Sequence, residues 1–307
     1  MAGMARPRTT LPTSTLGNGR YELIDSIGTG GMATVYRARD HWYGVERAIK
    51  LLAAHNAAVE KTRTRFVHEA RTMAQLDHPN IARIFDIGDG LDDHWYFVME
   101  YAPDGSLASF MRRHGPCPPH TALQFVYQML RGLDHAHTAG VVHRDVKPHN
   151  MVLDGDRILL TDFGIARVMA SEHSRITGTG DVLGTLAYMS PEQRIDPRNV
   201  GPSADLYGVG ATLYILVTGR RPFDLAMAAL DPFVLDRLPL PLRSVVRRAT
   251  AHLPDDRYQS AREMAEAICE AWEHLDPDAP PVAERMSAFS LDHDPTIIQV
   301  RHPTPDR

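Results

Sequence analysis

The pattern of apolar residues changes at Gly105, and this change limits the folds that are open to the chain. Before Gly105, short runs of β-branched and aromatic residues are broken by Gly or Asp, which is typical of strands. After it, apolar residues recur at helical spacing, as in Leu123, Val126, Leu130 and Leu133. A small antiparallel sheet followed by a mostly helical part is an α+β arrangement, and that is the fold class we predict.

The expected elements follow the same division. The predicted strands of the first part are 21–27, 34–39, 45–52, 81–87 and 94–99. One helix, 62–76, interrupts them because its apolar residues recur at helical spacing. In the second part we predict a helix that Gly140 ends, a hairpin of 151–153 with 158–160, and a buried helix over 204–218.

Composition argues against several classes of protein. A chain of 307 residues favours one large two-lobed domain or two small domains. The net charge of -5 gives no indication of a nucleic-acid partner. The opening residues lack the apolar core of a secretory signal, and the longest apolar run, 209–217, is too short for a membrane span. Only Cys117 and Cys269 are present, so we expect no disulfide framework and a cytoplasmic location.

The sixteen histidines do not form a metal-binding pattern. His135 and His137 are two residues apart, so on a helix they face different directions, and no Cys or HExxH partner accompanies them. We therefore interpret them as structural or surface residues.

A glycine-rich loop lies between two predicted strands, where backbone N–H groups could approach phosphate oxygens without an intervening Cβ. Its residues are Ile27, Gly28, Thr29, Gly30, Gly31, Met32, Ala33, Thr34 and Val35. A dinucleotide fold would need the loop to open a helix, and a Walker loop would need Gly-Lys-Ser/Thr, so neither fits. A glycine-rich hairpin without a ligand remains an alternative for this segment taken by itself.

Lys50 follows the apolar residues Ala48 and Ile49 in a predicted strand. Such a lysine is usually solvated. Glu69, however, lies on the following predicted helix, whose apolar face includes Phe66. A Lys50–Glu69 pair would aim the ammonium group at nucleotide phosphates.

The segment 142–150 packs charged and polar residues between apolar runs, and a Thr-Asp-Phe-Gly sequence follows the predicted hairpin. Asp145 can accept the hydrogen bond of an attacking hydroxyl, and Lys147 can neutralise charge on a transferred phosphoryl group. Asn150 and Asp162 offer oxygen ligands suited to Mg²⁺. Each residue alone could be a loop Asp or a capping Asn, but the ordered set predicts phosphoryl transfer.

These motifs, in this order, resemble the eukaryotic-like Ser/Thr protein kinases, and the Ile-Gly-Thr-Gly-Gly-Met-Ala-Thr-Val-Tyr opening is similar to the bacterial branch of that family. The resemblance implies a signalling enzyme that uses ATP and Mg²⁺ to phosphorylate Ser or Thr residues of protein substrates. It implies a bilobal kinase domain, with a small antiparallel-sheet N-lobe carrying one helix and a larger, mostly helical C-lobe. The expected boundaries are a disordered arm 1–20, the domain 21–275 (N-lobe 21–99, hinge 100–105, C-lobe 106–275) and a flexible tail 276–307.

Carried over residue by residue, the resemblance makes Asp145 the catalytic aspartate, Lys147 its partner, and Asn150 and Asp162 the Mg²⁺ ligands. Lys50 would pair with Glu69. The adenine ring would lie near the gatekeeper Met99, against Val35, Ala48 and Val152, and would bond the hinge backbone at Glu100 and Ala102. A regulatory spine would comprise Met73, Ile84, His143 and Phe163, anchored on Asp205.

The resemblance also has implications for substrates and regulation. Lys147 and Thr185 follow the Ser/Thr pattern, and Ser190-Pro191-Glu192 matches the end of the activation segment, where Glu192 would pair with Arg257. Arg144 beside the catalytic aspartate implies control by a phosphate on the activation loop. We predict autophosphorylation at Thr177 and Thr179. A homodimer, in which one chain phosphorylates the other, is a hypothesis for how this would occur.

The chain departs from the family at three points. Ala33 replaces the third glycine of the loop, and Ser190 stands where Ala is commoner, but both residues are small. The stretch 223–257 is shorter than usual in the region where the family places a helix that docks substrates. This difference affects the expected docking of substrates but not the expected phosphoryl transfer.

Two alternatives belong to other functional classes. A pseudokinase scaffold would typically lack one of the residues Lys50, Asp145 or Asp162, and all three are present. A small-molecule kinase of related fold would not need Thr185 or the segment 190–192. The complete set therefore favours an active protein kinase.

Overall fold

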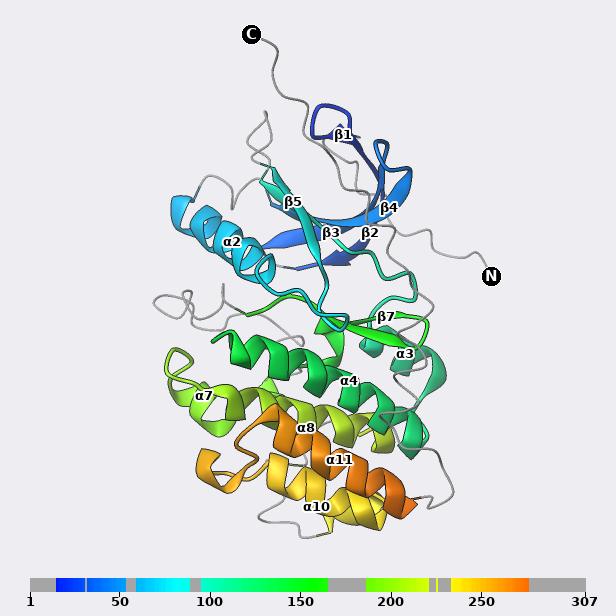
Figure 1. The fold of residues 1–307 in the computed structure, drawn as a ribbon, viewed down its shortest axis with the longest axis vertical. Coiled ribbons are helices and arrows are strands. Elements are labelled where there is room, and N and C mark those ends of the chain that lie inside the picture. Colours follow the sequence, from blue (N-terminus) through cyan, green and yellow to red (C-terminus); the bar gives the residue numbers. More distant parts are fainter. Residues whose placement is uncertain are drawn as a thin grey trace, which may run out of the picture.

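In the computed structural model, the described residues are 15–30, 32–53, 59–88, 95–164, 186–220, 225 and 233–275. They form two lobes, one built on a sheet and one on helices, which lie one above the other in Figure 1. Both the order of the lobes along the chain and their composition confirm the predicted α+β arrangement.

The sheet of the first lobe is antiparallel throughout, in the strand order β1-β2-β3-β4-β6-β5. Its strands are β1 (Thr15–Leu16), β2 (Tyr21–Thr29), β3 (Ala33–Asp40), β4 (Val45–Leu52), β5 (Ile84–Gly88) and β6 (Tyr96–Met99). Helix α2 (Glu60–Met73) lies beside the sheet and buries Phe66, Ala70 and Met73. Glu69 is the one charged residue on this buried face, so its carboxylate requires a partner.

Strand β1 departs from the expectation of a disordered arm through residue 20. Leu16 is buried and pairs with Tyr21, and the turn between them contains Gly17, Asn18 and Gly19, all with positive φ. Asn-Gly is a strong hairpin signal, so the sequence did carry the information for this turn.

The second lobe is built around two long helices, α4 (Pro119–Thr138) and α8 (Pro202–Thr218), which pack against each other. Helix α8 is buried on nearly all sides, and Gly219 ends it in the left-handed conformation, as the sequence predicts. Among the described residues, the other helices of this lobe are α3 (Leu107–His114), α7 (Pro191–Ile195), α10 (Leu240–Ala249), α11 (Ala261–Leu275), and the 3₁₀ helices η1 (Pro148–Asn150), η2 (Val234–Arg237) and η3 (Pro254–Asp256).

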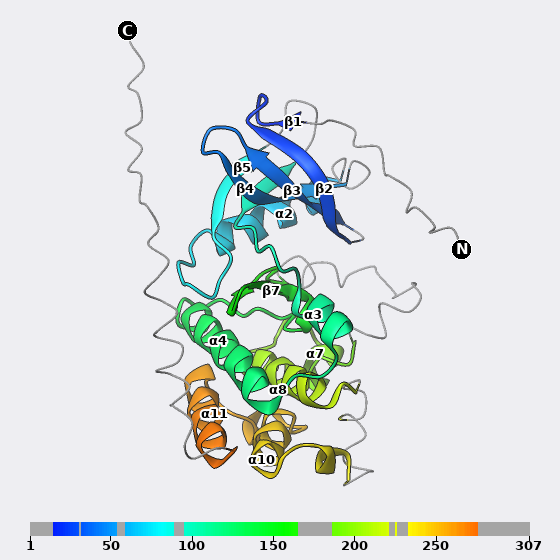
Figure 2. The same ribbon diagram turned by 90° about the vertical axis from the view of Figure 1, so that its right-hand side faces the viewer.

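The hairpin of β7 (Met151–Asp154) and β8 (Arg157–Leu160) lies between the sheet and the helical layers, as Figure 2 shows. It joins the lobes, because Ala82 N–H donates to Leu160 O and Leu160 N–H donates to Asn80 O, at 3.0 and 2.9 Å. For this reason Ile81, predicted as part of a strand, forms an isolated bridge to Leu160, and β5 begins only at Ile84.

Candidate active site

Lys50 lies at the junction of three elements. Its Nζ is 2.6 Å from Glu69 Oε1 on α2 and 2.8 Å from Asp162 Oδ1, which follows β8. The first contact is the pair that the strand and helix patterns predict. The second brings in a carboxylate from the other lobe, so a single ammonium group connects the two lobes.

Lys50 and its carboxylate partners stabilise one another's ionised forms. Burial alone would lower the pKa of Lys50, but the carboxylates of Asp162 and Glu69 outweigh it and raise the pKa above its usual value. Burial opposes the ionised form of Asp162 as well, yet the Lys50 ammonium lowers the pKa of that carboxyl below its usual range. At neutral pH the site therefore keeps both its ammonium and the Asp162 carboxylate.

Asp145, Lys147 and Asn150 meet on the loop that precedes β7. Lys147 Nζ lies 2.9 Å from Asp145 Oδ2. Asn150 donates from Nδ2 to the same Oδ2 at 2.9 Å and to the backbone carbonyl of Asp145 at 2.8 Å. The carboxylate is thus held from two sides by groups of its own loop.

Asp205 fixes the loop from below. Near the start of α8 it accepts backbone hydrogen bonds from His143 N at 2.8 Å and from Arg144 N at 2.7 Å. The side chain of His137 lies 2.7 Å from the same carboxylate. This matches the expected anchoring role of Asp205, and it makes His137 a structural residue, as interpreted from the sequence.

His143 is a neutral, fully buried imidazole with a defined tautomer. Burial lowers its pKa. Its Nδ1 accepts from Asp145 N at 3.2 Å, so its Nε2 donates to Thr161 O at 3.0 Å. Its ring lies 4.5 Å from that of Phe163. Met73 and Phe163 belong to one large apolar cluster and Ile84 packs against it, while the continuous spine of four residues stays a prediction.

The residues present fit a magnesium ion. Both acceptors of the Asn150 Nδ2 group lie on Asp145, which leaves the Asn150 amide oxygen facing away from that aspartate. Asp162 uses Oδ1 for Lys50, and its side chain is 37% exposed, so part of this carboxylate is open to a further partner. Hard oxygen donors of this kind suit Mg²⁺. Asn150 and Asp162 are only two groups, and within the described ranges no three or more His, Cys, Asp or Glu side chains come together as a metal site.

The residues predicted to hold an adenine ring lie on both lobes. Ala48 and Met99 are register partners in the sheet and belong to one buried cluster, against which Val35 packs. Val152 packs against the cluster of the other lobe. In the connecting segment, Glu100 N–H donates to Arg83 O at 2.9 Å.

The first residues of the glycine-rich loop are exposed, and the later ones are half-buried or buried. Residues 27–30 all face solvent, and Gly30 N–H closes the turn on Ala33 O at 2.9 Å. Met32 and Thr34 are half-buried next to it, and Ala33 is buried. Added Cβ atoms at Gly28 or Gly30 would meet no atom closer than 3.6 Å, so no described neighbour requires glycine at either position.

Glu192 and Arg257 form the expected ion pair. The guanidinium donates to both carboxylate oxygens at 2.7 Å, and Arg257 is almost fully buried. Arg257 also donates to three backbone carbonyls, those of Ser203, Ala251 and His252. This arrangement fixes α7 to the base of the lobe.

Two contacts were not predicted from the sequence. Arg157 on β8 binds the Glu100 carboxylate at 2.5 Å, which ties the connecting segment to the second lobe. Gln193 on α7 donates from Nε2 to the backbone carbonyl of Arg144 at 2.6 Å. Each joins residues far apart in the chain, and a lone polar residue gives no pattern that would predict its partner.

Some predicted residues lie outside the described part of the chain. They are Gly31, Thr177, Thr179 and Thr185. Of the shortened stretch 223–257, residues 225 and 233–257 are described, and Leu225 is buried.

The comparisons with known proteins agree with this geometry. The family model of the protein kinase domain matches residues 21–275. PrkC of Bacillus subtilis, a serine/threonine-protein kinase, is 38% identical over 269 residues, which are 83% of this chain and 41% of PrkC. PknL of Mycobacterium tuberculosis, also a serine/threonine-protein kinase, is 40% identical over 275 residues, 84% of this chain and 67% of PknL. The chain therefore spans less than half of the first relative and about two thirds of the second.

Solved structures agree as well. The PknI kinase domain of Mycobacterium tuberculosis has a TM-score of 0.64 at 30% identity, covering 85% of this chain and all of that domain. The chain belongs to the protein kinase domain family, and its two lobes are those of the kinase fold. Among the described residues, no helix combines the length and apolar character that a bilayer crossing requires.

Proposed function

We propose that this chain is an active Ser/Thr protein kinase, which transfers the γ-phosphoryl group of ATP to Ser or Thr hydroxyls of protein substrates. One observation carries the proposal: the group of Lys50, Glu69 and Asp162 and the group of Asp145, Lys147 and Asn150 lie on segments that a hydrogen bond connects. The group of Lys50, Glu69 and Asp162 spans both lobes. It is joined to the loop of Asp145 through Gly164 N–H, which donates to His143 O at 2.7 Å.

Each side chain has a distinct task in this proposal. Asp145, held by Lys147 and Asn150, accepts the hydrogen bond of the attacking hydroxyl and orients it. Lys147 supplies positive charge beside the transferred group. Lys50 binds phosphate oxygens as an ammonium ion, since its pKa is raised.

ATP and Mg²⁺ have separate binding groups. Asn150 and Asp162 would hold Mg²⁺, which when bound would neutralise charge on the phosphates. Val35 and Ala48 from one lobe and Val152 from the other would enclose the adenine ring. The Glu100 N–H is already bonded to Arg83, so the adenine would use the Glu100 carbonyl and the Ala102 N–H.

Regulation by autophosphorylation at Thr177 and Thr179 is a further part of the proposal. Arg144 supports it, because its Nε is buried and has no hydrogen-bond partner among the described residues, so that a phosphate oxygen would satisfy it. A homodimer acting in trans and a cytoplasmic location belong to the same proposal. Phosphosite mapping of active protein that found neither threonine modified would contradict this part.

The test is phosphate transfer from γ-labelled ATP with Mg²⁺ to the chain itself and to a generic basic protein. Wild type is compared with Asp145→Asn, which keeps the volume and removes the carboxylate. We expect wild type to label Ser or Thr and the variant to be at least about 100-fold slower, with an unchanged melting temperature.

Two other outcomes would favour the alternatives. A folded wild type that binds ATP and transfers nothing, even when phosphorylated beforehand on Thr177 and Thr179, would indicate a binding scaffold. Transfer of phosphate to small molecules alone would indicate a small-molecule kinase of related fold.

A further inference from the structure

The residue that precedes Asp145 has an unusual backbone. Arg144 has φ of 64°, in the left-handed region that a non-glycine residue adopts only at a cost in free energy. A conformation of this kind persists only where its surroundings hold it. The question is which groups hold this one.

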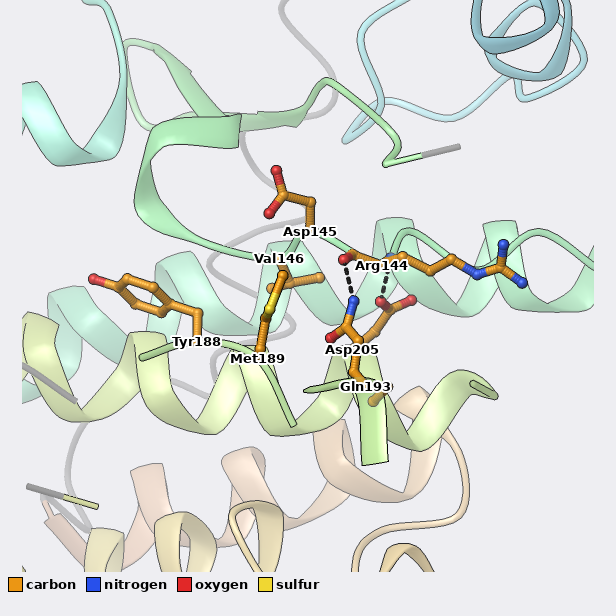
Figure 3. Close-up of a pocket in the computed structure, with 8 residues that line it drawn as sticks. Arg144, Asp145, Val146, Tyr188, Met189, Gln193 and Asp205 are labelled. Carbon is orange, nitrogen blue, oxygen red and sulfur yellow. Dashed lines mark hydrogen bonds between the residues drawn. The ribbon is translucent and has the colours of Figure 1, made fainter. Parts of the chain in front are cut away.

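Side chains from two different helices hold both polar atoms of the Arg144 backbone (Figure 3). Asp205 on α8 accepts from Arg144 N at 2.7 Å, and Gln193 on α7 donates to Arg144 O at 2.6 Å. Figure 3 shows both bonds converging on Arg144 beside Asp145. Asp205 has the expected anchoring role, whereas Gln193 matches no motif of the sequence.

The carbonyl that Gln193 holds belongs to the peptide plane that also contains Asp145 N. That N–H donates to His143 Nδ1 at 3.2 Å, so the plane is fixed at both of its polar atoms. The orientation of this plane sets the direction in which the Asp145 side chain leaves the backbone. A rotation here would move the carboxylate, although no side-chain contact of Asp145 had changed.

Gln193 is itself rigidly placed. It is 7% exposed, and it directly follows Glu192, whose carboxylate binds the buried Arg257 at 2.7 Å through both oxygens. The chain of contacts therefore runs from Arg257 through Glu192 and Gln193 to the peptide before Asp145. The first link is a bidentate ion pair, the second is the backbone between two neighbouring residues, and the third is a hydrogen bond of 2.6 Å.

We propose that Gln193 is a positioning residue for Asp145, which acts by holding the 144–145 peptide through the Arg144 carbonyl; this rests on the proposed kinase function. Because Gln193 contacts the backbone beside Asp145 and lies on a helix of the second lobe, whereas Val35 and Ala48 lie in the sheet of the first, we expect it to affect the transfer step and to leave nucleotide binding nearly unchanged. The amide is required as a donor, since a backbone carbonyl can only accept.

The experiment compares Gln193→Met and Gln193→Glu with wild type. Methionine keeps the length and removes the donor, and glutamate places a second acceptor against the carbonyl. We expect kcat to fall about 10-fold in Gln193→Met and further in Gln193→Glu, with KM for ATP within about twofold of wild type. A kcat within twofold of wild type, or a KM that rises as much as kcat falls, would overturn the proposal.

Gln128→Met is the matched control for loss of stability. Gln128 is 3% exposed and also donates to a backbone carbonyl, that of Asp156 at 2.7 Å, but it does not contact the 144–145 peptide. We expect this variant to lower the melting temperature at least as much as Gln193→Met while keeping kcat within about threefold. If its kcat fell equally, the loss in Gln193→Met would reflect general destabilisation, and the proposal would be wrong.

Hydrogen exchange separates this inference from the kinase function. The Asp145 amide is expected to exchange about tenfold faster in Gln193→Met than in wild type, whether or not the protein transfers phosphate. A wild type without transfer activity would overturn the proposed function, and the exchange rate would still decide whether Gln193 holds the peptide. Equal exchange in both proteins would overturn the inference while leaving the function intact.

Discussion

Two ion pairs in this molecule differ in the number and the location of the groups that the cation binds. The Arg257 guanidinium makes two bonds to Glu192 and three more to backbone carbonyls, all within one lobe. The Lys50 ammonium is shared between Glu69 on α2 and Asp162 from the other lobe. The first arrangement permits one geometry, because every donor has its own acceptor. The second depends on how the two lobes lie relative to each other.

The difference shows that one ion pair can hold the fold together while another remains able to change partners. A bidentate arginine with extra carbonyl partners is rigid and fixes neighbouring elements, here α7 and the residues it carries. A lysine is a compact charge that can exchange one carboxylate for another or for a phosphate. We infer that the Glu192–Arg257 pair maintains the fold and that the Lys50 group serves the chemistry.

The largest expected effect concerns Arg257. Arg257→Met leaves Glu192 without its partner and removes donors from three carbonyls, so unfolding should become easier by about 3–5 kcal/mol. The measurement is the midpoint of urea denaturation. The slope of the unfolding free energy against urea concentration is expected to be the same in both proteins. A shift below about 1 kcal/mol would show that the pair does not hold the lobe together.

A smaller effect is expected at His78, a half-buried imidazole at which burial outweighs the nearby carboxylates of Asp77 and Asp134. His78 lies near the junction of the lobes, and its Nδ1 accepts from Asn80 N at 3.0 Å. Burial, together with nearby His135 and Arg131, lowers the pKa of His78 to about 4. Below the ordinary pKa of about 6.5, the unfolded chain binds a proton that the folded chain does not, so stability falls between pH 6.5 and 4.

His78→Asn should make this decline shallower, because asparagine offers an acceptor and takes no proton in this range. Melting temperatures of both proteins are measured from pH 7 to pH 4.5. Parallel curves for the two proteins would show that His78 does not titrate as described. A shallower decline would extend the comparison to a group whose nearby carboxylates, Asp77 and Asp134, are outweighed by burial.

The parts of the site that follow from local sequence were predictable. Asp145, Lys147 and Asn150 lie within one short segment, so their order alone indicated how they would be used. Lys50 and Glu69 could be paired because a strand and the buried face of a helix indicated where each side chain would point. The α+β class followed from the change of pattern at Gly105.

Contacts between distant single residues could not be predicted in this way. Gln193 and Arg144 are 49 positions apart, and Gln193 lies on a five-residue helix that is too short to show periodicity. Arg157 and Glu100 are likewise joined only by the folded hairpin. Strand β1 is a different case: its Asn-Gly turn is present in the sequence, but we interpret the Thr-, Pro- and Gly-rich opening residues as a disordered arm without considering the turn.

The most direct test of the comparison is single-turnover phosphate transfer by Lys50→Met and wild type, both confirmed as folded by urea denaturation. The variant should lose at least about 100-fold in transfer rate while its stability changes by less than about 2 kcal/mol, because Asp162 reaches solvent and buried Glu69 can take up a proton. Transfer within about threefold of wild type would contradict the account, and so would a loss of stability as large as that of Arg257→Met.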